Sequence, residues 1–211
     1  MILQRQFYER DTLIVARELL GKFLVHETSE GVTSGKIVET EAYKGPEDKA
    51  SHAYDNLRSK RTEVQFGPKG HAYIYLVYGM YHCFNVTSGD APGKPEAILV
   101  RSLEPVSGIE IMMKRRKISK AHLINLTSGP GRLCMALGLS TKQNVADLCV
   151  PPLYVERGVT VDKENIARTT RVNVDYADDW KDLPWRFFIR SNAFVSKANQ
   201  QRKTKAGAPK D

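Results

Sequence analysis

The stretch from Lys36 to Tyr43, which reads KIVETEAY, places the strongest constraint on how this chain can fold. Its β-branched residues alternate with other side chains, and Gly45-Pro46 follows as a turn signal, so we expect a β-strand. Side chains point alternately to the two faces of a strand. One face is therefore expected to carry Ile37, Glu39, Glu41 and Tyr43, and the other Val38, Thr40 and Ala42.

The two glutamates of this strand need an explanation, because carboxylates are rarely buried unless they are paired or used. They could lie on a solvated face or pair with nearby Lys or Arg. Two carboxylates about 6.6 Å apart along a strand also suggest a glycosidase. Side chains leaving one strand in the same direction cannot readily flank a bond from two sides, which favours a supporting role for Glu39. A second buried strand, 97–103, carries one arginine, Arg101, whose partner could be Glu39 or Glu41.

The remaining elements predict an α+β fold. A helix is expected from Asp11 to Gly21, with Asp11 as N-cap, and further strands are expected at 153–156, 171–174 and 186–190. A helix is expected from Val106 to Lys117, after Pro105. Strands and helices do not alternate regularly, so we expect a single domain with a curved, mostly antiparallel β-sheet and surrounding helices over residues 1–196. Residues 197–211 form a basic tail that we expect to be disordered.

The densest aromatic segment, residues 71–86, predicts a hairpin that bends at Gly79. Buried tyrosines need partners for their hydroxyl groups, so four tyrosines in one hairpin are costly as packing alone. The long polar loop before it, residues 44–71, contains His52 and is longer than an ordinary connection, which favours a functional loop.

The charge of the chain points to a polyanionic partner. Lys and Arg number 32 against 24 Asp and Glu, a formal net charge of +8. Nucleic acid is the first candidate and a membrane surface the second. The three cysteines form no disulfide framework and no metal-binding pair, and no segment predicts a membrane span or a signal peptide. We therefore expect a cytoplasmic protein.

Several separated segments then carry a specific resemblance: VETEAY at 38–43, GPED at 45–48 with His52 following, YIYLVYGMY at 73–81, Asn85, VRSLEP at 100–105 and SGP at 128–130. In this order they resemble the alkyladenine (3-methyladenine, N-methylpurine) DNA glycosylases over roughly residues 10–195. The resemblance implies a bacterial, nucleoid-associated enzyme of base-excision repair. Its partner would be double-stranded DNA containing damaged purines, and it would act as a monomer.

The resemblance also assigns roles to residues of this sequence. Glu41 would be the general base that activates water, and Arg101 would position that water. Tyr43, His52 and Tyr75 would stack on the extruded base, and Asn85 would exclude guanine. Tyr78 would intercalate into DNA, while Arg132, Ser128 and Gly129 would contact the DNA backbone.

No metal or organic cofactor is implied, and no lysine in these motifs suggests a Schiff base, so the enzyme would be monofunctional. The main alternative is a non-catalytic nucleic-acid binding module that stacks its tyrosines on unpaired bases.

Overall fold

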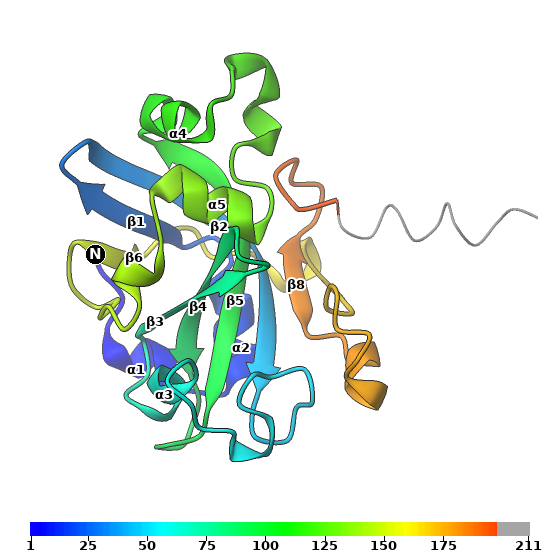
Figure 1. The fold of residues 1–211 in the computed structure, drawn as a ribbon. Coiled ribbons are helices and arrows are strands. Elements are labelled where there is room, and N and C mark those ends of the chain that lie inside the picture. Colours follow the sequence, from blue (N-terminus) through cyan, green and yellow to red (C-terminus); the bar gives the residue numbers. More distant parts are fainter. Residues whose placement is uncertain (198–211) are drawn as a thin grey trace, which may run out of the picture.

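The computed structural model describes residues 1–197 of the 211-residue chain. An eight-stranded sheet, whose strand pairs are antiparallel, forms its centre (Figure 1). The main path runs β3-β4-β5-β2-β1-β6, and β8 pairs with both β2 and β7. The strands are β1 (Phe23–Thr28), β2 (Gly31–Lys44), β3 (Ala72–Val77), β4 (Tyr81–Ser88), β5 (Glu96–Ser107), β6 (Leu153–Glu156), β7 (Ile166–Thr169) and β8 (Arg186–Ile189).

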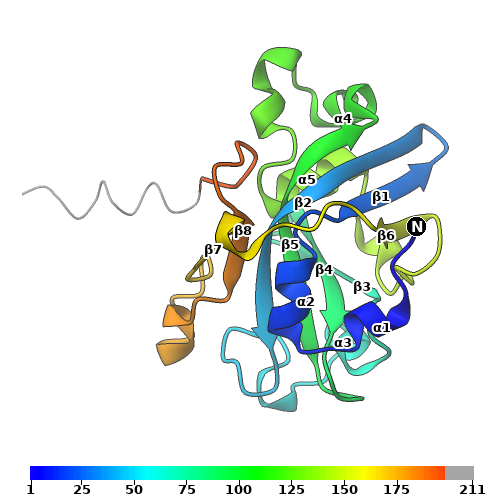
Figure 2. The same cartoon turned by 180° about the vertical axis from the view of Figure 1, so that it is seen from behind.

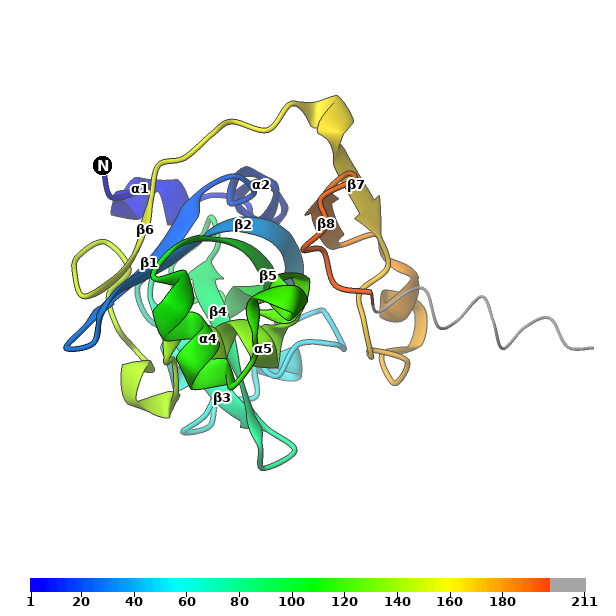
Figure 3. The ribbon, with the colours of Figure 1, turned by 90° about the horizontal axis from the view of Figure 1, so that it is seen from above.

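Short helices surround this sheet, so the expected α+β fold with a mostly antiparallel sheet is confirmed. Helix α2 packs against β2 and β5 from one side and lies in front of them in Figure 2. Helices α4 and α5 lie on the other side of the curved strands in Figure 3. The α-helices are α1 (Arg5–Tyr8), α2 (Thr12–Glu18), α3 (Glu63–Phe66), α4 (Ile109–Arg116) and α5 (Pro130–Leu137). The 3-10 helices are η1 (Tyr54–Asn56), η2 (Lys120–Asn125), η3 (Thr141–Gln143), η4 (Lys163–Asn165) and η5 (Asp178–Asp182).

Strand β2 connects the parts of the sheet, since it pairs with β1, β5 and β8. Its position against α2 is fixed by the hydroxyl of Thr40, which donates to the carbonyl oxygen of Ala16 over 2.8 Å. As expected, Asp11 caps α2, where its carboxylate accepts from the backbone N–H groups of Leu13 and Ile14.

The expected alternation along β2 holds from Glu39 onward and is wrong for Ile37. The pairing of β2 with β5 shifts register around Val38 and again after Glu39. A bulge of this kind changes which face the preceding residues occupy. Ile37 therefore belongs to the main hydrophobic core with Ala42, whereas Glu39 and Glu41 reach polar partners.

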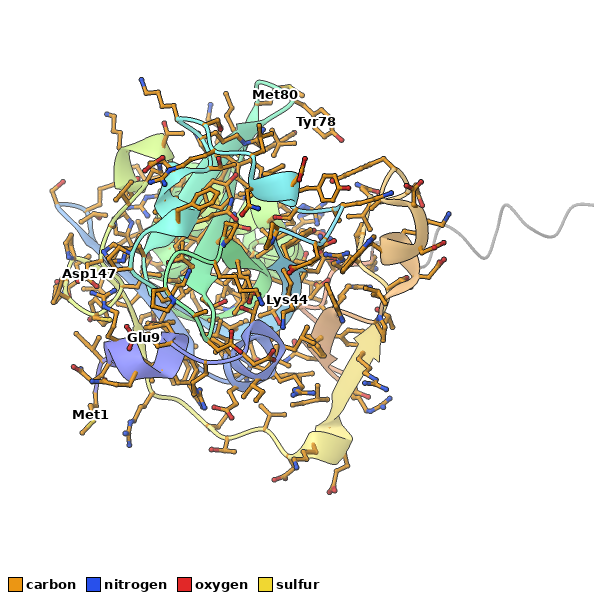
Figure 4. The ribbon with its side chains drawn as sticks, turned by 90° about the horizontal axis from the view of Figure 1, so that it is seen from below. Met1, Glu9, Lys44, Tyr78, Met80 and Asp147 are labelled. Carbon is orange, nitrogen blue, oxygen red and sulfur yellow. The ribbon has the colours of Figure 1, made fainter. Side chains whose placement is uncertain are left out.

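The aromatic hairpin is formed by β3 and β4, with Tyr78, Gly79 and Met80 at its turn. The backbone N–H of Met80 donates to the carbonyl oxygen of Val77 over 3.1 Å, so Tyr78 (φ +52°) and Gly79 (φ +69°) are the two central residues of a tight turn that requires positive φ at both positions. Tyr78 is 82% exposed, and Figure 4 shows it with Met80 at the tip of the hairpin, projecting from the body of the protein.

Two expected elements are corrected by the structure. Strand β5 runs through Pro105 to Ser107, and α4 begins only at Ile109, after Gly108 turns the chain with φ +69°. A side chain at Gly108 would approach the carbonyl oxygen of Val32 to 2.3 Å, so this turn requires glycine. Residues 171–174 do not form a strand, because Asn173 adopts φ +58°.

The predicted basic tail, residues 197–211, lies outside the described residues beyond Lys197. Among residues 1–197, the helices are all too short or too polar to cross a lipid bilayer.

Candidate active site

A cavity of about 850 Å³ opens over β2, β4 and β5, beside the β3–β4 hairpin and the start of α5. This is large enough to hold a nucleobase with its sugar. Segments that are far apart in the sequence meet here because the sheet places β2, β5 and β4 side by side. The predicted site residues that line the cavity are Tyr43, His52, Tyr75, Tyr78, Asn85, Arg101, Ser128, Gly129 and Arg132.

Glu41 is fully buried and is held next to this cavity by three donors. The hydroxyl of Tyr43 donates to Oε2 of Glu41, and the backbone N–H of Val172 donates to Oε1, each over 2.8 Å. The guanidinium of Arg101 lies 3.3 Å from the same Oε1. A carboxylate offers about four lone-pair positions. Three of these positions are occupied, which leaves one on Oε2, but Glu41 is fully buried and is not itself among the residues that line the cavity.

Arg101 is charged and lies between the two glutamates of β2. Its Nε donates to Glu39 over 2.8 Å, while Nη1 faces Glu41. Burial on its own would lower the pKa of Arg101, but the charges of Glu41 and Glu39 outweigh it and raise that pKa above its ordinary value. The sequence suggested either Glu39 or Glu41 as the partner of Arg101, and the structure shows that Arg101 contacts both.

Tyr43 forms one wall of the cavity and is itself packed from behind. Burial, reinforced by the charge of Glu41, raises the pKa of Tyr43 well above its ordinary value, so its hydroxyl stays protonated and donates. The guanidinium carbon of Arg171 lies 4.8 Å from the centre of the Tyr43 ring. Arg171 is fully buried and forms an ion pair with Asp48, which is also buried. This pair joins the loop after β2 to the segment that carries Val172.

The opposite wall consists of His52, Tyr73 and Tyr75. The rings of His52 and Tyr75 meet edge to face, with centroids 4.7 Å apart, and Nδ1 of His52 lies 2.8 Å from the hydroxyl of Tyr73. Burial, with a smaller contribution from the nearby charge of Arg61, lowers the pKa of His52 to about 4. The imidazole is therefore neutral at pH 7.

A guanidinium group lies against this wall. The Arg61 guanidinium carbon is 4.4 Å from the centre of the Tyr75 ring, and Nη2 of Arg61 is 3.0 Å from Nε2 of His52. Arginine is always a donor, so Nε2 accepts and the proton of the neutral imidazole lies on Nδ1, facing the Tyr73 hydroxyl. Arg61 thus covers a ring face on which a planar base could stack.

The remaining predicted residues lie at the edges of the cavity. The side-chain amide of Asn85 is buried and donates to the carbonyl oxygen of Tyr73 over 2.9 Å. Arg132, on the first turn of α5, is exposed and donates to the side chains of Asn125 and Ser128. Gly129 is the N-cap residue of this helix and has φ +128°.

Comparison with known proteins places this chain in a family. The model of the Methylpurine-DNA glycosylase (MPG) family matches residues 6–193. The chain belongs to the methylpurine-DNA glycosylase family. It is therefore a DNA glycosylase, a hydrolase of N-glycosyl bonds that serves DNA repair, and the alternative of a non-catalytic binding module is wrong.

Similar bacterial proteins cover nearly the whole glycosylase chain. A protein of Clostridium acetobutylicum named "Putative 3-methyladenine DNA glycosylase" is 49% identical over 202 residues, which are 93% of this chain and 98% of that protein. Proteins with the same name from Alkaliphilus oremlandii and Bacillus mycoides are 46% and 49% identical. The match to the Alkaliphilus oremlandii protein covers 93% of this chain and all of that protein. The match to the Bacillus mycoides protein covers 90% of this chain and 97% of that protein.

The candidate site also contains residues that the sequence patterns did not single out. Arg186 and Ser196 bind Glu39, and Tyr73 belongs to the wall that it forms with His52 and Tyr75. Arg61 and Arg171 pack against the rings of Tyr75 and Tyr43. Arg186 carried the same signal as Arg101, an arginine in an apolar strand. Within residues 1–197, no three His, Cys, Asp or Glu side chains come together as candidate metal ligands.

Proposed function

We propose that this glycosylase removes alkylated or deaminated purines from double-stranded DNA and leaves an abasic site. The substrate class comprises 3-methyladenine, 7-methylguanine, ethenoadenine and hypoxanthine. The observation that supports this proposal most is a buried carboxylate, Glu41, paired with Arg101 directly beside a cavity walled by tyrosines. The curated relatives named for 3-methyladenine agree with it.

Base recognition begins with extrusion of the damaged nucleotide, because the N-glycosyl bond is inaccessible inside the duplex. The exposed Tyr78 at the hairpin tip fills the gap that the base leaves. The extruded base stacks between Tyr43 and the wall of His52 and Tyr75. Alkylated purines are often cationic, and a cation binds well against an electron-rich ring. The amide of Asn85, held by the carbonyl oxygen of Tyr73, excludes the 2-amino group of guanine by a steric clash.

Hydrolysis follows with Glu41 as general base. A water molecule on the free position of Oε2 attacks C1′ of the deoxyribose, its proton passes to Glu41, and the base leaves with the electron pair of the N-glycosyl bond. Arg101 positions this water and forms an ion pair with Glu41. Because water attacks C1′ directly, no covalent intermediate forms. A cationic ring-alkylated purine leaves as a neutral base, whereas hypoxanthine or ethenoadenine leaves as an anion that takes up a proton from solvent, and Glu41 returns its proton to solvent. Ser128, Gly129 and Arg132 contact the DNA backbone at the start of α5.

The remaining parts of the proposal concern the protein's state. It acts as a monomer on nucleoid DNA in the bacterial cytoplasm. Sedimentation of the protein with and without a lesion-containing duplex tests the monomeric state.

The test of the catalytic proposal is base release from duplex oligonucleotides containing each of the four lesions. Glu41→Gln keeps the shape of the side chain but cannot accept the proton. We expect it to slow single-turnover release by at least about 10²-fold, while binding to a duplex with an abasic-site analogue remains. Glu164→Gln, an exposed glutamate away from the cavity, serves as the matched control. Normal turnover by Glu41→Gln would contradict the role of Glu41, and failure of the wild-type protein to release any of these bases would contradict the substrate class.

A further inference from the structure

The second glutamate of β2, Glu39, has no capacity left for substrate or water. Its buried carboxylate accepts five hydrogen bonds. Nε of Arg101, Nε of Arg186 and Oγ of Ser196 donate to Oε1, over 2.8, 2.7 and 2.9 Å. Oγ of Ser102 and the backbone N–H of Ser196 donate to Oε2, over 3.0 and 2.7 Å. Since a carboxylate offers about four lone-pair positions, Glu39 cannot act as a second acid or base.

These contacts also keep Glu39 ionised. Burial alone would raise the pKa of Glu39, but the charges of Arg101 and Arg186, together with the N–H of Ser196, outweigh burial and lower it. This part of the interior therefore contains two carboxylates, of Glu39 and Glu41, and two guanidinium groups, of Arg101 and Arg186. Their formal charges cancel, which is the condition under which buried charges are tolerated.

The geometry of Arg101 depends on Glu39. A guanidinium is planar, so fixing Nε against one carboxylate decides which nitrogen faces the other. With Nε on Glu39, Nη1 lies 3.3 Å from Glu41 and Nη2 lies 3.5 Å from the hydroxyl of Ser196. A long arginine side chain without this support would have other rotamers available.

Ser196 brings a distant part of the chain to this cluster. It lies 157 residues after Glu39, in the segment after β8 that Figure 1 draws in orange-red beside the sheet. Its carbonyl oxygen also accepts from Nη2 of Arg186 over 3.4 Å. The segment therefore forms hydrogen bonds with both Glu39 and Arg186.

We propose that Glu39, Arg186 and Ser196 are positioning residues that hold the Arg101 guanidinium toward Glu41, so that the segment after β8 is part of the active centre. This inference rests on the proposed function, in which Arg101 positions the attacking water. It predicts that the cluster acts on the chemical step through Arg101 and leaves DNA binding unchanged.

The experiment measures single-turnover release of hypoxanthine and ethenoadenine by full-length variants, together with affinity for a duplex containing an abasic-site analogue. Ser196→Ala removes one hydroxyl and should slow release roughly 3- to 10-fold, as expected for one hydrogen bond. Glu39→Gln should slow release by about 10²-fold, as for loss of a preorganised electrostatic contact. The affinity of both variants for the analogue should lie within about twofold of wild type, because the residues proposed to contact the DNA backbone are unchanged. Ser140→Ala, which removes a hydrogen-bonded serine that caps η3 away from the cluster, should have no effect.

A double-mutant cycle with Arg101→Ala separates positioning from general support of the fold. If Glu39 acts through Arg101, Glu39→Gln should slow release little further once Arg101 is gone. Additive losses, or normal release rates in folded Glu39→Gln and Ser196→Ala, would overturn this inference alone. If Glu39→Gln does not fold, Ser196→Ala and its cycle with Arg101→Ala decide the matter. A wild-type chain that releases no base would overturn the proposed function first and this inference with it.

Discussion

Replacing Asp48 by Asn should destabilise the protein strongly, because it breaks a fully buried ion pair. Asp48 and its partner Arg171 both have fully buried side chains. The carboxylate also accepts from the backbone N–H groups of Lys44 and Ala50, over 3.1 and 2.9 Å. Asn keeps the size of the side chain, but it leaves the Arg171 charge uncompensated in the interior and turns an N–H₂ group toward existing donors.

The magnitude follows from the burial of the pair. Breaking a buried ion pair by removing one partner costs about 3–5 kcal/mol. For a protein of this length, 1 kcal/mol corresponds to roughly 2–4 °C in melting temperature, so Asp48→Asn should lower it by about 6–20 °C. Arg171 keeps two carbonyl contacts, to Ala42 and Trp180, and its cation–π contact with Tyr43. These remaining contacts make the lower half of that range the better expectation.

Urea unfolding at neutral pH measures this loss, with calorimetry for the melting temperature. The matched control is Glu63→Gln, which breaks the Arg58–Glu63 pair in a solvent-exposed position. Water and salt screen that pair, so its loss should leave the midpoint unchanged. If Asp48→Asn lost less than about 1 kcal/mol, the reasoning about burial would be refuted. At temperatures where Asp48→Asn is still folded, its base release should also be slower than that of the wild type. Arg171 adjoins Val172, whose backbone N–H donates to Glu41.

Three further predictions concern residues that line the cavity. Tyr78→Ala should leave the melting temperature unchanged, since the side chain is 82% exposed, but should slow excision from duplex more than from single-stranded DNA; equal slowing on both substrates would argue against a wedge. The pKa of His52 is lowered to about 4, so the folded state resists protonation: stability present above about pH 6.5 is lost as pH falls toward 4. His52→Gln should therefore flatten the dependence of the urea midpoint on pH in this window, and an unchanged slope would assign the acid sensitivity to other groups. Arg61→Ala should tighten binding of an ethenoadenine duplex, because in the wild type a base must displace the Arg61 guanidinium from the Tyr75 ring. Fluorescence titration measures this affinity, and weaker binding would mean that Arg61 contacts DNA instead.

Local patterns in the sequence determined much of the fold and part of the site. Alternation along β2 placed Glu39, Glu41 and Tyr43 on one face, and the aromatic hairpin with its turn at Gly79 was visible from residue types alone. These features depend on strand periodicity and on turn conformation, which neighbouring residues control. The charge balance likewise indicated a polyanionic partner without any knowledge of the fold.

Only the tertiary structure decided which charges meet. The bulge at Val38 moved Ile37 into the core, and the positive φ of Asn173 replaced an expected strand with the turn that brings Val172 to Glu41. The partners of Glu39 come from residues up to 157 positions away, and strand register and chain crossings set them. Periodicity tells which face a side chain occupies but not what stands opposite, because that depends on contacts formed across the whole sheet.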